Sequence, residues 1–284
     1  KVIPSAGHRN VLAARNTGVS FSSGHILIFI DADIFTCIGD LKQSLARLPQ
    51  EGNTCLFAVY NRGEHLLNAV SRYKNFWIRY STLSAPRPIQ WLNSSLIIIH
   101  RTTFLRAGGF LGDFSCSYGG EDIDLGRRIT EAGGTIILDE HLEVAHLKQF
   151  TLPGLWLNDL RRARGWLRYA LVHKGFVSVI GRPSLANVSL GFTGSIVLAV
   201  LAVLAAALAP LWTPSIFLSA CLLLLSLLFN LPFVGAAFRE KIRGAPLFIP
   251  LLWFDQMACA TGICIELTYL ISRSGRKRSP SSIS

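Results

Sequence analysis

The sequence has few acidic residues, and its cysteines do not follow the spacing of a metal site. Its 284 residues include 17 Asp and Glu against 28 Lys and Arg, for a net charge of +11. The six cysteines are not spaced as pairs of metal ligands, and three of them lie in apolar stretches. We expect them to be reduced and mostly packed, as in a cytoplasmic setting. They are Cys37, Cys55, Cys116, Cys221, Cys259 and Cys264.

No nucleic-acid-binding motif accompanies the excess of basic residues. Proteins that bind nucleic acids usually combine such charge with a recognisable module. Here the basic residues gather next to apolar stretches, where anionic lipid headgroups are the simpler partner. The sequence therefore predicts contact with a membrane and no nucleic-acid partner.

The composition divides the chain into two parts. Residues 1–182 carry nearly all the acidic, histidine and arginine residues, whereas residues 183–284 are dominated by Leu, Ala, Ile, Val and Phe. A domain of ~100 to 200 residues fits the first part. In the second, the uncharged stretches 188–212 and 215–238 each exceed the ~20 residues that a spanning helix needs. They predict a transmembrane hairpin, and the alternative is a pair of buried core helices.

A third apolar stretch, residues 246–272, contains Asp255 and Glu266. Acidic groups at membrane depth are costly unless they are paired or wetted, so both are candidates for a functional role. This stretch either spans the membrane, re-enters it or lies at its interface. The sequence leaves these alternatives open.

Positive charges flank the predicted hairpin but are absent from its connecting loop. Arg182 precedes it, and Arg239, Lys241 and Arg243 follow it. The positive-inside rule then places the first part of the chain in the cytoplasm, attached to an inner or plasma membrane. Basic residues at 273–278 contradict the rule if the third stretch crosses. Either the rule is broken once or that stretch does not cross.

Two acidic motifs occur at positions where α/β proteins bind ligands. The apolar run 26–30 predicts a fully buried strand, with Asp31 and Asp33 at its carboxyl end. Farther along, Gly119 and Gly120 allow a sharp turn into Glu121 and Asp122, ahead of a helix predicted over 123–132. The alternatives are a solvated turn for the first motif and helix capping for the second.

These motifs, in this order, resemble the family 2 glycosyltransferases, enzymes of the GT-A fold that use nucleotide sugars. The resemblance covers residues 2–170 and implies an α/β, Rossmann-like domain for transfer from a nucleotide diphosphosugar, followed by transmembrane helices. The matching segments are Ala14-Arg15-Asn16-Thr-Gly18, Asp31-Ala-Asp33, Trp91-Leu-Asn93, Gly119-Gly-Glu-Asp-Ile-Asp124, His146 and Arg161-Arg-Ala-Arg-Gly-Trp166.

The resemblance implies roles for the acidic residues. Asp33 and Asp31 would bind Mg²⁺ or Mn²⁺, with Asp31 also close to the ribose or the donor sugar, and His146 would complete the metal site. The cation would stabilise the leaving diphosphate. Asp122 would be the general base that deprotonates the acceptor, with Glu121 beside it. A packed or surface histidine is the alternative for His146.

The resemblance also implies substrate contacts. Arg15 and Asn16 would shape the nucleotide side, although packing is an equal alternative. Residues Arg161, Arg162, Arg164 and Trp166 match imperfectly the Gln-x-x-Arg-Trp element of processive members, which puts processivity in doubt. Guanidinium groups suit a diphosphate and an indole suits stacking. A basic amphipathic helix on the membrane is the competing interpretation. Trp77, Trp91 and Tyr118 would line an acceptor groove unless they are core residues.

The function expected from these observations is that of a membrane-bound, inverting hexosyltransferase. It would transfer sugar from a nucleotide-sugar donor to a lipid, lipid-linked or polysaccharide acceptor at the cytoplasmic face. One alternative is a processive polysaccharide synthase, and another is a non-catalytic, membrane-anchored protein that binds nucleotide sugars. Since the family's first strand and helix have no counterpart before Lys1, we also expect the chain to be incomplete at its amino terminus.

Overall fold

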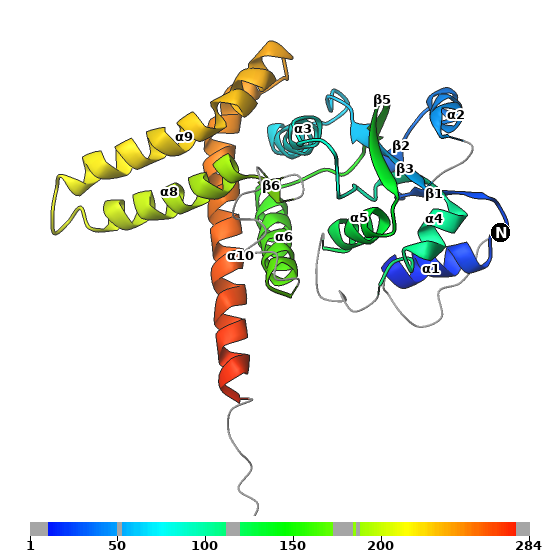
Figure 1. The fold of residues 1–284 in the computed structure, drawn as a ribbon. Coiled ribbons are helices and arrows are strands. Elements are labelled where there is room, and N and C mark those ends of the chain that lie inside the picture. The colour runs from blue at the N-terminus through cyan, green and yellow to red at the C-terminus, as the bar shows by residue number, and fades with distance from the viewer. Residues whose placement is uncertain (1–10, 50–52, 112–119, 173–183, 186–187, 277–284) are drawn as a thin grey trace, which may run out of the picture.

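A computed structural model describes residues 11–49, 53–111, 120–172, 184–185 and 188–276. Its first part is a mixed β-sheet with helices packed around it, and its second part consists of long apolar helices (Figure 1). This architecture confirms the predicted fold class, an α/β domain followed by a helical segment. The predicted boundary between residues 182 and 183 lies outside the described residues.

The sheet contains five strands in the spatial order β1-β4-β3-β5-β2. Strands β3 and β5 are parallel, and the other neighbours are antiparallel. Alternate residues of β3 belong to different apolar clusters, Phe57 to one and Leu56 to the other, so both faces of this strand are packed. The strands are β1 (Ile26–Ile30), β2 (Ile34–Phe35), β3 (Thr54–Tyr60), β4 (Leu96–His100) and β5 (Thr135–His146).

Strand β1 has the predicted bounds, but the prediction that it is fully buried is wrong. Leu27 and Phe29 are buried, whereas Ile26, Ile28 and Ile30 are exposed. The cause is its position, because β1 ends the strand order and packs only one face against the core. Its carboxyl end leads directly to Asp31 and Asp33.

Six helices lie among the described residues of the first part of the chain. Asn68 caps α3 by accepting a hydrogen bond from the Ser71 backbone N–H at 2.8 Å. The helix predicted after the Gly119-Gly120 turn is confirmed as α5, although it begins two residues earlier than predicted. The helices are α1 (Val11–Ser20), α2 (Ile38–Arg47), α3 (Ala69–Leu83), α4 (Arg101–Arg106), α5 (Glu121–Glu131) and α6 (Leu152–Val172).

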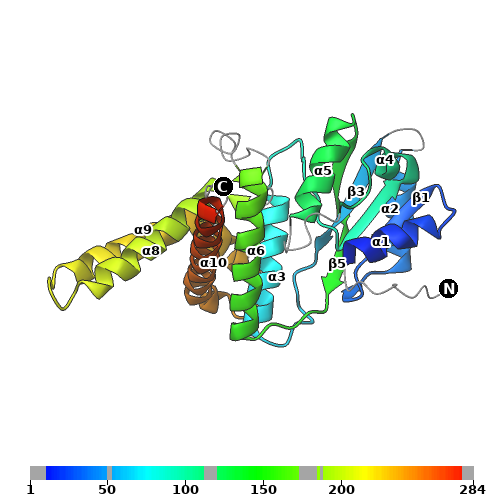
Figure 2. The same ribbon diagram turned by 90° about the horizontal axis from the view of Figure 1, so that it is seen from below.

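Three further helices are long and apolar enough to cross a membrane. Helices α8 (Leu190–Ala207) and α9 (Ser215–Arg239) lie side by side in both views, as expected for a hairpin (Figures 1 and 2). Helix α10 (Phe248–Arg276) follows a 3₁₀ turn, η2 (Ala245–Leu247). Two short strands, β6 (Ser184–Leu185) and β7 (Val188–Ser189), precede the hairpin.

Helix α10 lies beside α6 and runs crosswise to the hairpin (Figures 1 and 2). Gly262 makes this approach possible, since a Cβ atom there would lie 2.3 Å from the Leu160 carbonyl oxygen. Farther along, the buried Glu266 carboxylate accepts hydrogen bonds from Arg164 at 3.0 Å and from Arg168 at 2.8 Å. Half of the apolar window of α10 is buried inside the protein, against 22% for α9.

An apolar cluster joins the α/β domain to the apolar helices. Tyr73 and Phe76 of α3 pack with Phe233 of α9 and Phe248 of α10, and all four side chains are buried. Continuous packing of this kind fixes the position of two parts of a chain relative to each other. The helical segment is therefore part of one core with the domain.

Candidate active site

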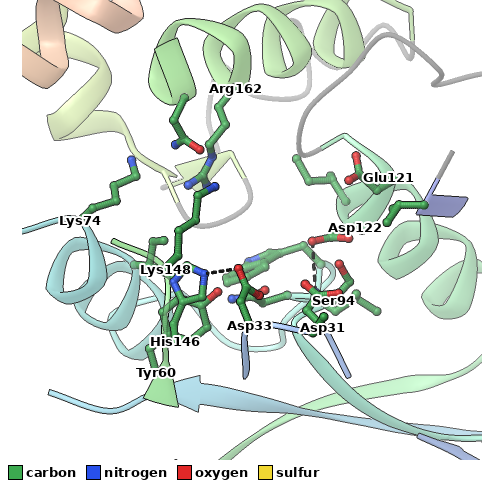
Figure 3. Close-up of a pocket in the computed structure, with 18 of the residues that line it drawn as sticks. Asp31, Asp33, Tyr60, Lys74, Ser94, Glu121, Asp122, His146, Lys148 and Arg162 are labelled. Carbon is green, nitrogen blue, oxygen red and sulfur yellow. Dashed lines mark hydrogen bonds and ion pairs between the residues drawn. The ribbon is translucent and has the colours of Figure 1, made fainter. Parts of the chain in front are cut away.

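A cavity of about 680 Å³ lies where the carboxyl end of β1, the start of α5 and the middle of α6 meet (Figure 3). It brings together eight of the residues predicted to bind substrate or metal or to act in catalysis, which come from segments far apart in the chain. These are Arg15, Asp31, Asp33, Glu121, Asp122, His146, Arg162 and Trp166. The cavity therefore contains both acidic motifs and one face of the arginine-rich part of α6.

Arg15 and Asp31 form an ion pair at one side of the cavity. The Arg15 Nη2 atom lies 2.6 Å from Asp31 Oδ1, and its guanidinium lies over the Phe110 ring at 5.0 Å. Burial raises the pKa of Asp31, although the charge and hydrogen bond of Arg15 oppose the rise. The pair fixes the positions of the Arg15 guanidinium and the Asp31 carboxylate at the cavity wall.

Asp33 and His146 face each other across the β2–β5 pair. His146 Nε2 lies 3.4 Å from Asp33 Oδ2, and the Leu147 backbone N–H donates to the Asp33 carbonyl oxygen at 2.8 Å. The imidazole stacks on the Tyr60 ring with the centroids 4.8 Å apart. Burial lowers the pKa of His146, although the Asp33 charge opposes the change. A neutral imidazole offers a nitrogen lone pair to a cation.

The pair of Asp33 and His146 is suited to a divalent cation that receives its other ligands from a substrate. Within the described ranges, no three His, Cys, Asp or Glu side chains come together as a complete metal site. Mg²⁺ commonly binds one or two carboxylates together with substrate phosphates and water, and imidazole also suits Mn²⁺. The residues present fit such a partly completed site.

Asp122 lies opposite this pair, in the first turn of α5. Its Oδ2 atom accepts a hydrogen bond from the Ser94 backbone N–H at 3.1 Å (Figure 3). Its Oδ1 atom is buried and has no hydrogen-bond partner among the described residues. Burial raises the pKa of this carboxyl, opposed by the Ser94 hydrogen bond and by the charges of Arg15 and Arg162. Asp122 thus lies at the cavity wall with one carboxylate oxygen that no described residue satisfies.

Three residues singled out with this site do not line the cavity. Asn16 instead binds the backbone of Phe110, donating to its carbonyl oxygen at 2.6 Å and accepting from its N–H at 3.1 Å. Arg164 pairs with Glu266 of α10. Arg161 is also absent from the cavity wall. The geometry gives Asn16 and Arg164 structural contacts, and their predicted substrate roles gain no support.

Of the aromatic residues predicted to line an acceptor groove, some line the cavity and others do not. Trp91 lines the cavity, whereas Trp77 lies outside it, with Lys74 Nζ 4.7 Å from the centre of its ring. Tyr118, like Cys116, falls outside the described residues.

Several residues of the cavity were not found from the sequence. Among them, Lys74 of α3 is only 2% exposed and forms an ion pair with the buried Asp159. A lysine between Tyr73 and Phe76 on an aromatic helix was the available signal, because a buried charge needs a partner. The others include Tyr60, Ser94, Lys148, Phe150 and Asn158.

Comparison with known proteins gives limited similarity to sugar transferases. No protein-family model matches the sequence. A human protein named probable polypeptide N-acetylgalactosaminyltransferase 8 is 23% identical over 215 residues, which is 68% of this chain and 33% of the relative. A solved structure of the mannosyltransferase PcManGT from Pyrobaculum calidifontis, in complex with GDP-Man and Mn²⁺, aligns with a TM-score of 0.48 and 16% identity. That alignment covers 93% of this chain and 69% of the other. The chain thus spans about a third of the length of the curated relative that it matches.

Proposed function

We propose that this protein is a membrane-bound, inverting glycosyltransferase of the GT-A type, related to family 2. It transfers a hexose from a nucleotide-sugar donor to a lipid or lipid-linked acceptor. The observation that carries the proposal is the placement of two different acidic groups in one cavity: the Asp33–His146 pair, suited to a cation, and Asp122, whose Oδ1 atom has no hydrogen-bond partner among the described residues. The similarity to a relative named as an N-acetylgalactosaminyltransferase agrees with it.

The cavity residues divide the work of the transfer. A divalent cation held by Asp33 and His146 would neutralise charge on the leaving diphosphate. The Asp122 carboxylate accepts the proton of the acceptor's OH group, on an alcohol or on a lipid phosphate, as the acceptor oxygen forms the bond to the anomeric carbon. The bond from that carbon to the diphosphate breaks, and its electron pair goes to the diphosphate oxygen. Attack opposite the leaving group inverts the anomeric configuration.

Activity is expected to fall at acidic pH because Asp122 must be deprotonated to act as a base. Since burial raises its pKa, the protonated form persists to higher pH than for an ordinary aspartate, whose pKa is about 3.9. On the acidic side of the pH profile, kcat/KM is therefore expected to fall at a pH above that value. A pH profile of transfer measures it, with donor binding at each pH as the control. Full activity down to pH of about 4 contradicts this assignment.

Removal of divalent cations is expected to abolish transfer, and Mn²⁺ is expected to restore it. The purified protein is incubated with radiolabelled nucleotide sugars and membrane lipids, with EDTA or with added Mn²⁺. The substitutions Asp33→Asn and His146→Gln should each raise the Mn²⁺ concentration for half-maximal transfer by about 10-fold or more. Glu140→Gln, at an exposed carboxylate of β5 outside the cavity, is the control.

The outcome of this assay also separates the candidate functions. Metal-dependent label in the lipid extract supports the proposal and identifies the donor sugar. Label in a ladder of polymer indicates a processive synthase instead. Binding of nucleotide sugar without transfer to any acceptor favours a non-catalytic binding protein.

The hairpin is the segment that we propose to cross the membrane, with the α/β domain in the cytoplasm. Glu240, directly after α9, pairs with Arg62 at 3.3 Å and Arg79 at 3.6 Å, so the basic end of α9 lies against the domain. The positive-inside rule favours the cytoplasmic side for the basic end of α9 and therefore for the domain beside it. Helix α10 runs crosswise to the hairpin, and half of its apolar window is already buried. We infer that α10 lies along the membrane surface.

A carboxyl-terminal reporter is expected to lie on the same side as the α/β domain. With two crossings, the end of α10 stays in the cytoplasm, whereas a third crossing would move it outside. Green fluorescent protein fused after Ser284 should therefore fluoresce, and alkaline phosphatase fused there should be inactive. Fusions after Trp212, in the hairpin turn, should give the opposite pair of results. Active phosphatase after Ser284 would show that α10 crosses.

A further inference from the structure

A second, apolar pocket of about 150 Å³ lies between α6, α8 and α10. Its walls contain almost no polar surface, and Trp166 is common to this pocket and to the larger cavity. The indole therefore separates an apolar compartment from a polar one. The pocket is lined by Ala163, Trp166, Leu167, Ala170, Val188, Leu190, Thr193, Ile196, Cys259 and Ile263.

Positive charge gathers on the cavity side of Trp166. Arg162, one turn earlier on α6, lies over the indole ring at 5.0 Å, and its guanidinium lines the cavity. Lys148 lines the cavity as well (Figure 3). In the part of the chain that the structure describes, no carboxylate forms an ion pair with either residue. Guanidinium and ammonium groups that form no direct ion pair suit a phosphate.

We propose that the pocket binds the hydrocarbon chain of a membrane lipid phosphate, with the phosphate at Arg162 and Lys148. The choice of a lipid acceptor rests on the function proposed above. The lipid would pass beside Trp166, so that its apolar part contacts the walls of the pocket and its anionic head reaches the cavity. The two compartments match the two chemical halves of one amphiphilic molecule.

A lipid is the occupant that agrees with the surroundings of the pocket. Two of its three walls come from helices long and apolar enough to cross a membrane, and the large exposed side chains of α8 nearby, Leu190 and Val197, are apolar. Water would find almost no hydrogen-bond partners in it. Hydrocarbon chains are the abundant apolar material beside such helices, and a phosphate head accounts for the cations beside Trp166.

The test uses dodecyl phosphate that carries a photoreactive diazirine on its terminal carbon. The full-length protein in detergent micelles is irradiated with this probe, and the labelled residues are mapped by mass spectrometry. Labelling is expected on pocket residues of α6, α8 and α10, and excess unlabelled dodecyl phosphate should compete with it. Thr193→Phe, which fills the pocket from an exposed position, should reduce this labelling several-fold.

Val197→Phe is the matched control. Val197 lies one turn later on α8, is 57% exposed and does not line the pocket, so this substitution adds the same ring outside it. Equal labelling of both variants, or label only on the outer face of the α8–α9 hairpin, would overturn the proposal. Comparable thermal unfolding of the two variants ensures that the comparison concerns the pocket.

The same probe separates this inference from the proposed activity. Labelling does not require sugar transfer, so a labelled pocket in a protein that transfers no sugar would support the lipid site and contradict the glycosyltransferase assignment. Transfer to dodecyl phosphate that Thr193→Phe leaves unchanged would support the enzyme and overturn the pocket as the acceptor site.

Discussion

Replacement of Asp122 by Asn is expected to reduce sugar transfer by about 10²- to 10⁴-fold, the usual contribution of a general base. The amide has the same shape and can still accept the hydrogen bond from the Ser94 backbone. It cannot take a proton from the acceptor hydroxyl, however. Donor binding is expected to change little, so the loss should be found in kcat.

The measurement is the rate of transfer at saturating donor, together with calorimetric binding of the nucleotide sugar. Glu131→Gln is the matched control, because Glu131 ends the same helix and its side chain is 59% exposed. It should leave both quantities unchanged. Transfer by Asp122→Asn at the rate of the unmodified protein would remove the carboxylate from the mechanism.

Replacement of Lys74 by Met is expected to destabilise the protein by about 3–5 kcal/mol, as when one partner of a buried ion pair is removed. The lysine ammonium lies against the Asp159 carboxylate and 4.0 Å from Asp255 Oδ2, and all three side chains are buried. Tyr73 donates a hydrogen bond to Asp255 at 2.8 Å. Without the lysine, two buried carboxylates would have no cation beside them at these positions.

Thermal unfolding in detergent measures this effect. Lys148→Met is the control, since Lys148 is exposed and its substitution should stay within about 0.5 kcal/mol. The triple variant Lys74→Met, Asp159→Asn, Asp255→Asn should recover part of the loss, because it removes the uncompensated charges as well. An unfolding temperature of Lys74→Met equal to that of the original protein would show that the ion pair carries no net stability.

The parts of the fold that could be predicted are those encoded over short segments. The run 26–30 gives β1 and places Asp31 and Asp33 at its end, and two uncharged stretches give the α8–α9 hairpin. The strand order could not be predicted, since it depends on pairing between segments far apart in the sequence. For the same reason the edge position of β1, and with it the exposure of one face, was missed.

The arginine-rich helix shows why part of the site could not be predicted. A motif read as one unit in the sequence is distributed around a helix, where successive residues are about 100° apart. Arg162 and Trp166, four residues apart, share the face toward the cavity, whereas Arg164 faces α10 and pairs with Glu266. Lys74 was missed because its partners, Asp159 and Asp255, come from two other helices.

The contacts of α10 also set an order of events during synthesis. Tyr73 and Asp255 are separated by 182 positions, and Arg164 and Glu266 by 102. A ribosome makes α10 after the segments that it contacts, so the α/β domain leaves it before the carboxylates of Asp255 and Glu266 exist. Every residue of the larger cavity is then present, but α3 and α6 are still without this neighbour. Completion of the fold would thus wait for α10, and a chain that ends before Phe248 would be a substrate for quality control.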